Sequence, residues 1–185
     1  VVHNGISENF RALKDELIAG GAHFLSDTDT EVVALLVDRE LRAGRSPTEA
    51  VGLVLPRLIG AFALAFLFEG ENNLLIAARK GSPLAIGYGK GQMYLGSDAI
   101  ALGLFTDEIV YLEEGDWAIL TREGVEIRDV TGKVVARPML KVPASAIMVD
   151  KGNHRHFMAK EIYEQPEAIA HTYGHYLDLS EETVA

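Results

Sequence analysis

The hydrophobic pattern of this sequence changes once, near Gly60, and that change constrains the fold more than any other feature. Before Gly60, apolar residues recur every three or four positions, as on the buried face of an amphipathic helix. After it comes the continuous apolar run Ala61–Phe68, typical of a strand buried on both faces, and then shorter apolar stretches between turn residues. A helical pattern returns from about Phe157. Helices followed by antiparallel strands and a final helix indicate an α+β fold.

Start signals predict three helices before Gly60. Each begins with a Ser or Thr whose side chain can accept a hydrogen bond from the first turn. In the second and third, a Glu follows three residues after the cap, which is the spacing of a capping box. The predicted helices run from Ser7 to Gly20, from Thr28 to Leu41, and from Ser46 to Leu58.

Turn residues divide the rest of the chain into short elements. The predicted strands are Ala61–Phe68, Leu74–Arg79, Leu84–Tyr88 and Met93–Leu95, read as a four-stranded meander, and then Ile109–Leu112, Asp116–Thr121, Val125–Asp129 and Val134–Arg137. A short helix at Ser97–Leu104 separates the two groups. Pro138–Asn153 is predicted to be a linker, and the last helix is predicted to be interrupted at Pro166 on its way to Tyr176.

Charge and cysteine content exclude several classes of function. The 17 Lys and Arg residues face 27 Asp and Glu, a net charge of −10, which argues against nucleic acid and anionic membrane as partners. The longest uncharged apolar run, Leu58–Phe68, is about half of the roughly 20 residues that a membrane-spanning helix needs. The chain has no cysteine, so disulfides, Cys-ligated metals and thiol catalysis by its own residues are excluded.

Three motifs are weak candidates for chemistry. His154/His156 and His171/His175 are the close histidine pairs, but no further ligand pattern supports a metal site, and surface histidines are the favoured interpretation. Gly87, Gly89 and Gly91 resemble a phosphate-binding loop, yet a strand follows them, which favours a hairpin turn. Neither a metal nor a cofactor is therefore expected.

The start of the chain carries a more informative pair. The β-branched opening Val1–His3 reads as the middle of a strand, so we expect a fragment whose upstream part is absent, with Asn4–Gly5 forming a turn. A side-chain amide next to a backbone N–H can also form an oxyanion hole, although Asn-Gly is a common tight-turn dipeptide. Asp29 is open to two interpretations, a helix-capping residue, which its position favours, or a carboxylate that binds a cation.

Several segments taken in order resemble one known family. They are Val1-Val2-His3-Asn4-Gly5-Ile6, Ser26-Asp27-Thr28-Asp29-Thr30-Glu31-Val32, Ala77–Leu84, Gly96-Ser97-Asp98, Leu112–Asp116 and His156–Pro166. Together they are similar to the glutaminase domain of the glutamine–fructose-6-phosphate aminotransferases, which are class II glutamine amidotransferases. The run Lys-Glu-Ile-Tyr-Glu-Gln-Pro within His156–Pro166 is the most specific of these segments.

The resemblance implies a fold, a reaction and roles for three residues. The fold is the αββα four-layer sandwich of the N-terminal-nucleophile hydrolases, here in part. An N-terminal cysteine of the family hydrolyses L-glutamine to glutamate and ammonia, which an isomerase domain uses to make glucosamine 6-phosphate from fructose 6-phosphate. Carried over by position, Asn4 and Gly5 match the oxyanion hole, and Asp29 matches the carboxylate that binds the α-ammonium group of glutamine.

The resemblance also sets expectations for the chain as a whole. Residues 1–150 would be the C-terminal portion of the glutaminase domain, and 151–185 its end and the linker to the isomerase domain. The nucleophilic cysteine has no counterpart here, so we expect the chain alone to be inactive and to expose a sheet edge that favours self-association. The full-length protein would be a cytoplasmic homodimer. The alternatives are the glutaminase domain of another class II amidotransferase and a non-catalytic interaction module of the same fold.

Overall fold

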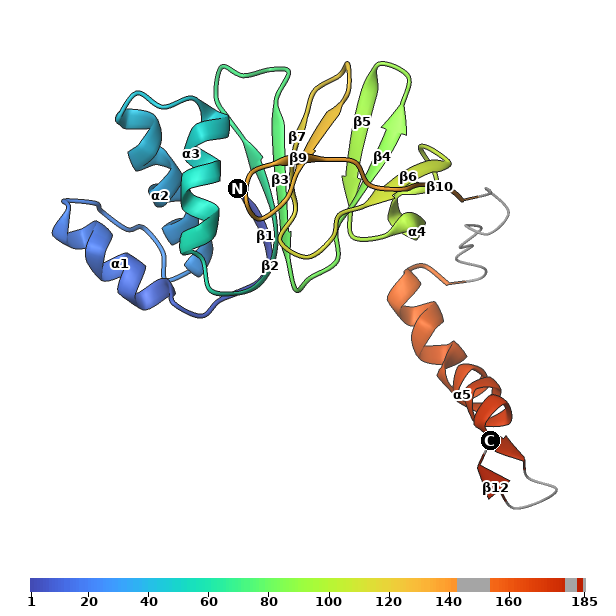
Figure 1. Ribbon diagram of the computed structural model, residues 1–185. Helices are drawn as coiled ribbons and strands as arrows, with labels where there is room; N and C mark the ends of the chain where they lie inside the picture. The colour runs from blue at the N-terminus through green and yellow to red at the C-terminus, as the bar shows by residue number, and fades with distance from the viewer. Residues whose placement is uncertain (143–153, 179–182, 185) are drawn as a thin grey trace. The chain divides into compact units, whose positions relative to one another are not determined.

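The computed structural model describes residues 1–142, 154–178 and 183–184. The chain divides into two compact units, Val1–Ile147 and Met148–Ala185. Figure 1 shows the first unit as a group of helices beside two β-sheets, and the second as a long helix with a short strand pair. Among the described helices, none is long and apolar enough to cross a membrane.

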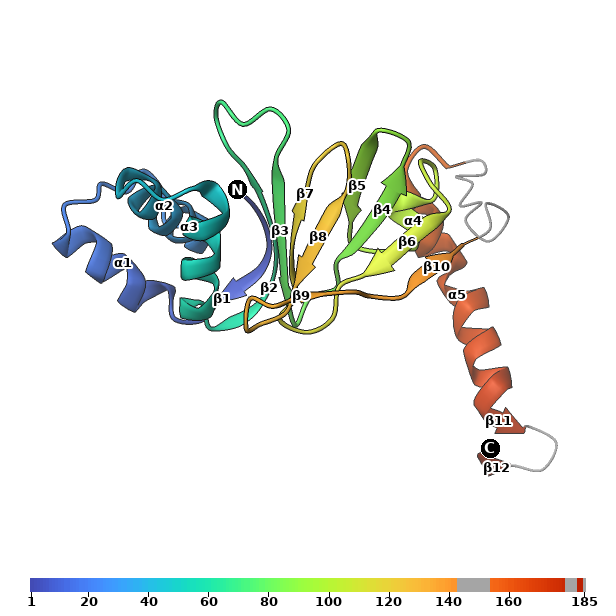
Figure 2. The same cartoon turned by 45° about the horizontal axis from the view of Figure 1, so that its top comes forward.

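The helical segments before the first long strand pack together on one face of a sheet (Figure 2). They are α1 (Phe10–Ala19), α2 (Asp29–Arg42), α3 (Pro47–Val54) and the 3₁₀ turn η1 (Leu55–Arg57). The predicted capping box at Ser46 and Glu49 is present, and Pro47 occupies the first turn of α3. Thr28 caps α2 as predicted by accepting from the Glu31 amide, but the Glu31 side chain binds the amides of Leu25 and Ser26 instead of closing a capping box.

The described strands of this unit form two antiparallel sheets. The first has the order β1-β2-β3-β7-β8-β9 and the second the order β10-β6-β4-β5. Their bounds are β1 Val2–Ser7, β2 Gly60–Leu67, β3 Leu75–Lys80, β4 Ala85–Gly89, β5 Gln92–Gly96, β6 Glu108–Tyr111, β7 Trp117–Leu120, β8 Val125–Arg128, β9 Val134–Val135 and β10 Met139–Lys141. Within the described strands, β1 is therefore one edge of the first sheet.

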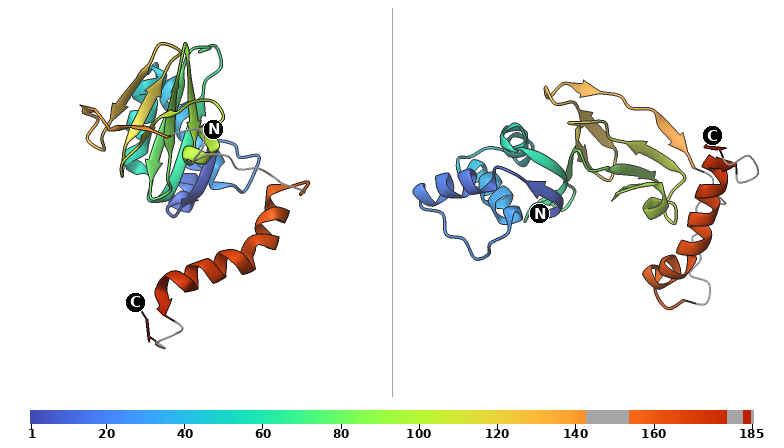
Figure 3. Two further views of the ribbon diagram at one scale, coloured as in Figure 1. Left: turned by 90° about the vertical axis from the view of Figure 1, so that its right-hand side faces the viewer. Right: turned by 90° about the horizontal axis from the view of Figure 1, so that it is seen from below.

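Three apolar clusters show how the layers stack. One packs α1, α2 and α3 against the first sheet through residues such as Leu36 and Phe66. A second fills the space between the two sheets, with Ala63, Ile86 and Leu120 among its members. A third lies under the short helix α4 (Ala99–Leu102) on the outer face of the second sheet. The order helix, sheet, sheet, helix confirms the predicted αββα architecture, as Figure 3 also shows.

Two predictions at the start of the chain are wrong. Asn4–Gly5 is not a turn, because each residue of β1 pairs in continuous register with β2, from Val2 opposite Ala65 to Ser7 opposite Gly60. Ser7 does not cap the first helix, since it ends β1 and α1 begins only at Phe10. The local sequence suggested a tight turn, but pairing with a strand more than fifty residues away overrides that preference.

Two predictions about later segments are also wrong. The four strands after Gly60 do not form one meander, because β3 pairs with β7 while β4 and β5 belong to the second sheet. The predicted linker Pro138–Asn153 contains strand β10, whose residues Met139–Lys141 pair with β6. The rest of that segment, from residue 143, lies outside the described residues.

The second unit contains α5 (Phe157–Tyr176) and the strand pair β11 (Leu177–Asp178) and β12 (Thr183–Val184). Helix α5 continues through Pro166, where an interruption was predicted. A proline removes only one backbone donor, and the turns on both sides of Pro166 maintain the helix.

Candidate functional site

The edge strand β1 carries the first candidate residues and directs its side chains to two faces of the sheet. Asn4 lies opposite Ala63, which belongs to the core between the sheets. His3 lies opposite Leu64, which belongs to the core under the helices. Because directly paired residues of neighbouring strands share a face, Asn4 faces the second sheet and His3 faces the helices.

Asn4 borders a groove of about 560 Å³ between the open edges of the two sheets. Its walls are mostly apolar and come from β1, β2, β3 and β5, with Ala63, Leu75, Met93 and Leu95 among them. The Asn4 side chain is exposed, so its amide is accessible from this groove. The groove is large enough for a small polar metabolite with an apolar stem.

Gly5 occupies a position that no other residue type can take without strain. Its φ is +137°, and an added Cβ would lie 2.1 Å from the Ala61 carbonyl oxygen and 2.7 Å from Cα of Phe62. The close approach of β2 therefore requires glycine at this position. An exposed backbone without a side chain leaves room for another molecule to approach the Gly5 amide.

Asp29 is the first residue of α2, and its carboxylate is anchored to β1. Its Oδ2 accepts a 2.8 Å hydrogen bond from the Ser7 amide. Its Oδ1 lies 3.5 Å from Nδ1 of His3. Thr28 performs the capping role at this helix end, and 21% of the Asp29 side chain is exposed. A carboxylate has about four acceptor positions, so Asp29 retains capacity to bind a cation.

The loop before Asp29 is held by Glu31. The carboxylate of Glu31 accepts hydrogen bonds from the Leu25 amide at 2.7 Å, the Ser26 amide at 2.7 Å and the Ser26 hydroxyl at 2.6 Å. These bonds, led by the one from the Ser26 hydroxyl, hold the pKa of Glu31 below its usual value. Together with the Thr28 cap, they fix the residues on both sides of Asp29.

Sequence reasoning missed His3, which lies between Asp29 and Thr30. Its Nδ1 is 3.1 Å from the Thr30 hydroxyl, and only 2% of its side chain is exposed. Nε2 is buried and has no hydrogen-bond partner among the described residues. The only signal in the sequence is a histidine in a predicted strand. The residues that His3 contacts, Asp29 and Thr30, lie 26 and 27 positions further along the chain.

The structure thus places the three predicted residues around one edge strand. Asn4 and Gly5 lie within β1, and Asp29 binds the backbone of the same strand at Ser7. The groove beside Asn4 and the carboxylate of Asp29 lie on different faces of β1 but at the same open sheet edge.

The other candidate motifs of the sequence are the histidine pairs of the second unit and the glycine motif of the first. Among the described residues, no group of three or more His, Asp or Glu residues is arranged to hold a metal ion. The ring of His154 stacks on that of Tyr163, with centroids 5.4 Å apart. The glycine motif forms the hairpin between β4 and β5, as predicted.

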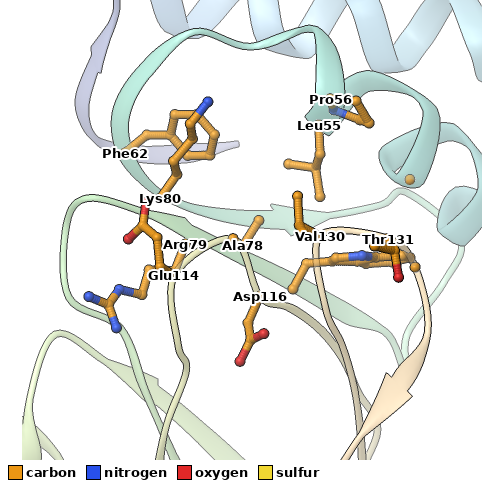
Figure 4. Close-up of a pocket in the computed structure, with 14 residues that line it drawn as sticks. Leu55, Pro56, Phe62, Ala78, Arg79, Lys80, Glu114, Asp116, Val130 and Thr131 are labelled. Atoms are coloured by element: carbon orange, nitrogen blue, oxygen red, sulfur yellow. The ribbon is translucent and has the colours of Figure 1, made fainter.

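A second cavity, of about 510 Å³, lies beside the ends of α3, β3 and β7 (Figure 4). Its lining includes Trp117 and two cations, Arg79 and Lys80. Both cations are already bound to main-chain carbonyl groups, Lys80 to Leu58 at 3.1 Å and Arg79 to Ser82 at 3.1 Å. None of the predicted site residues lines this cavity.

Comparisons with known proteins identify the family of this chain. The family model described as a glutamine amidotransferase domain matches residues 1–103, which include Asn4, Gly5 and Asp29. A glutamine–fructose-6-phosphate aminotransferase [isomerizing] of Brucella abortus biovar 1 (strain 9-941) is 62% identical over 180 residues, and that of Bradyrhizobium diazoefficiens is 59% identical over 185 residues. These matches cover 97% and 100% of this chain, which spans 30% of the length of each relative.

Two solved structures are similar in fold. The glutamine phosphoribosylpyrophosphate amidotransferase of B. subtilis, complexed with ADP and GMP, has a TM-score of 0.60 and 26% identity, and the match covers 72% of this chain and 29% of that one. A structure described as the allosteric regulatory enzyme of purine biosynthesis has a TM-score of 0.56 and 30% identity, covering 69% and 27%.

Proposed function

The chain belongs to the family of glutamine amidotransferase domains, and we propose that it is part of a glutaminase domain. In this proposal it binds L-glutamine and stabilises the oxyanion that forms while glutamine is hydrolysed. The observation that carries the proposal is the anchoring of Asp29 to β1, the strand that contains Asn4 and Gly5. Glutamine has an α-ammonium group at one end and a carboxamide at the other. The edge strand β1 and the α2 carboxylate bound to it therefore present a complementary group for each end.

The proposed roles follow from the chemistry of these groups. The Asp29 carboxylate is the natural partner of an ammonium group and keeps free acceptor positions for it. The Asn4 side-chain amide and the Gly5 main-chain amide are neutral donors for the negative charge that develops on the carboxamide oxygen. The requirement for glycine at position 5 comes from the close approach of β2, because an added Cβ would lie 2.1 Å from the Ala61 carbonyl oxygen.

We propose that the nucleophile is a cysteine outside these 185 residues, since the sequence contains none. In the full-length protein its thiolate attacks the amide carbon, and the carboxamide oxygen becomes an oxyanion facing Asn4 and Gly5. Ammonia leaves with a proton from the α-amino group of the cysteine, and water hydrolyses the thioester to glutamate. By itself the 185-residue chain is then inactive.

The relatives are named glutamine–fructose-6-phosphate aminotransferases [isomerizing], and this name suggests what the whole protein does. We propose that the ammonia is used to make glucosamine 6-phosphate from fructose 6-phosphate, in an isomerase domain beyond this chain. Residues 1–150 would then belong to the glutaminase domain, and residues 151–185 would lead into the isomerase domain of a homodimer. Exposed apolar side chains on α5, among them Met158, Ile162 and Tyr173, support a covering domain at this helix.

The glutamine-binding role is tested by replacing Asp29 with Asn in the full-length protein and measuring glutamine hydrolysis. Asn still accepts from the Ser7 amide but lacks the negative charge, so KM for glutamine is expected to rise about 10- to 100-fold with a smaller change in kcat. Asp27→Asn is the matched control, because its side chain is fully exposed two residues away. An unchanged KM in D29N would leave Asp29 as a structural residue only.

A further inference from the structure

The buried imidazole of His3 is not accounted for by stability. Its side chain is 2% exposed and faces the apolar core under the helices, opposite Leu64. Its Nε2 has no hydrogen-bond partner among the described residues. An apolar side chain at this position of β1 would avoid the cost of burying an unpartnered nitrogen. A residue that a sheet tolerates at such a cost is a candidate for a functional role.

The contacts of the other ring nitrogen point to that role. Nδ1 lies 3.1 Å from the Thr30 hydroxyl and 3.5 Å from Oδ1 of Asp29. The second oxygen of the same carboxylate, Oδ2, accepts from the Ser7 amide at 2.8 Å. Both oxygens of Asp29 thus face groups carried by β1, and these two contacts fix the orientation of the carboxylate plane relative to the strand.

The contacts of Nδ1 and the missing partner of Nε2 indicate which neutral tautomer of His3 the pocket favours. With the proton on Nε2, a buried N–H would lack a partner, and the lone pair of Nδ1 would face the Asp29 carboxylate. With the proton on Nδ1, the N–H donates to the Thr30 hydroxyl and carries positive partial charge within 3.5 Å of the Asp29 carboxylate, and only a lone pair remains unpartnered at Nε2. Orphaned buried donors are rarer than under-satisfied acceptors. The Nδ1–H form is therefore the one that this pocket stabilises.

We propose that His3 is a positioning residue for substrate recognition. Its Nδ1–H orients the Asp29 carboxylate, with Thr30 sharing the contact, so that the free acceptor positions of Asp29 face the α-ammonium group of glutamine. His3 thereby sets the preference for substrates that carry an α-amino group, and the chemical step at the carboxamide does not depend on it. This inference rests on the proposed function, in which Asp29 binds that ammonium group.

The test compares two substrates in the full-length protein. Glutaramate is glutamine without its α-amino group, so its hydrolysis reports the reaction without the Asp29 contact. His3→Phe keeps an aromatic ring and removes both ring nitrogens. We expect it to lower kcat/KM for glutamine at least about tenfold, the size of one lost interaction with a charged group, mainly through KM. Hydrolysis of glutaramate is expected to stay at the wild-type rate.

Conservative variants make the test specific for Nδ1. The amide nitrogen of His3→Asn can occupy the position of Nδ1, whereas that of His3→Gln reaches toward the position of Nε2. We expect His3→Asn to retain most of the preference for glutamine and His3→Gln to lose it. If His3→Phe fails to fold, as checked by its thermal unfolding, the comparison between Asn and Gln decides the question.

Three results distinguish failure of the His3 positioning role from failure of the proposed function. An equal loss for both substrates in His3→Phe and in both amide variants would overturn the proposal and leave His3 a structural residue. If Asp29→Asn abolishes the preference for glutamine while all His3 variants keep it, the positioning role fails and the proposed function stands. If Asp29→Asn itself keeps the preference, the proposed function fails at this residue and the positioning role fails with it.

Discussion

Gly5 and Ala61 approach so closely across the first two strands that a Cβ on Gly5 would lie 2.1 Å from the Ala61 carbonyl oxygen. Real Cβ atoms do not come this near to an oxygen, so β1 would have to move away from β2 to accept a side chain. The same strand carries Asn4 and is bound by Asp29 through Ser7. The position of the candidate site therefore depends on this one contact between backbones.

Replacing Gly5 with Ala is expected to destabilise the protein and disturb the site together. The positive φ alone costs about 1–3 kcal/mol for a residue with a Cβ, and the clash adds to it. Thermal unfolding of the variant measures the loss. Gly124→Ala is the control, because an added Cβ there would meet no atom within 4 Å. Equal unfolding temperatures for G5A and wild type would contradict the structure at β1.

A second prediction concerns the buried carboxylate of Asp116. Its side chain is fully buried and receives two hydrogen bonds from Arg137, at 2.8 and 2.9 Å, and one from the Glu113 amide at 2.8 Å. The bonds to Asp116 raise the pKa of Arg137 above its usual value, so the guanidinium stays charged. This pair ties the segment after β9 to the start of β7.

Replacing Arg137 with Met would leave the Asp116 charge buried without its cationic partner. Removing one member of a buried pair is strongly destabilising, and we expect a drop of several degrees in the unfolding temperature. Arg122→Met is the matched control on an exposed loop residue. An R137M protein as stable as this control would show that the ion pair contributes nothing to the fold.

The third prediction follows from the lowered pKa of Glu31. A carboxyl group whose pKa is lower in the folded state than in the unfolded state stabilises the fold above its unfolded pKa. That contribution is lost as the pH falls through the folded pKa, which hydrogen bonds from Ser26 and Leu25 hold below its usual value. The bonds from Leu25 and Ser26 to Glu31 are therefore expected to weaken only in acid.

The measurement compares the unfolding temperatures of wild type and Glu31→Gln between pH 7 and pH 3. We expect wild type to be more stable at neutral pH and the difference to shrink as the pH falls below about 4. Glu71→Gln, an exposed residue on the turn between β2 and β3, is expected to follow the wild-type profile. A difference between wild type and E31Q that stays constant over this range would contradict the stated role of Glu31.

Local signals in the sequence predicted the elements whose formation depends on neighbouring residues. The capping residues Thr28 and Ser46 and the doubly buried strand β2 are of this kind. The αββα architecture came from the resemblance to a family, since periodicity indicates only helices followed by strands. The pairing of β3 with β7 joins residues about forty positions apart, and nothing in either strand specifies that partner.

In the candidate site, too, local signals were informative for some residues, and the others depend on contacts with distant parts of the chain. The proposed roles of Asn4, Gly5 and Asp29 came from the resemblance, because local sequence alone favoured a helix cap for Asp29 and gave only a weak signal at Asn4–Gly5. His3 was missed, although it lies next to Asn4, because its importance comes from a contact with Asp29 that only the folded chain creates. The continuation of β1 through Asn4 and Gly5 likewise depends on pairing with a distant strand.

If Asn4 donates a hydrogen bond to the oxyanion formed during glutamine hydrolysis, kcat of Asn4 variants in the full-length protein will report the loss of that donor. We predict that Asn4→Ala lowers kcat roughly 10²- to 10³-fold with little change in KM, and that the nearly isosteric Asn4→Asp is equally impaired because it loses the donor. Asn72→Ala, on an exposed turn, is the control and should match wild type. Hydrolysis by N4A and N4D within about twofold of wild type would show that Asn4 is not an oxyanion-hole donor, because losing such a donor costs far more than that.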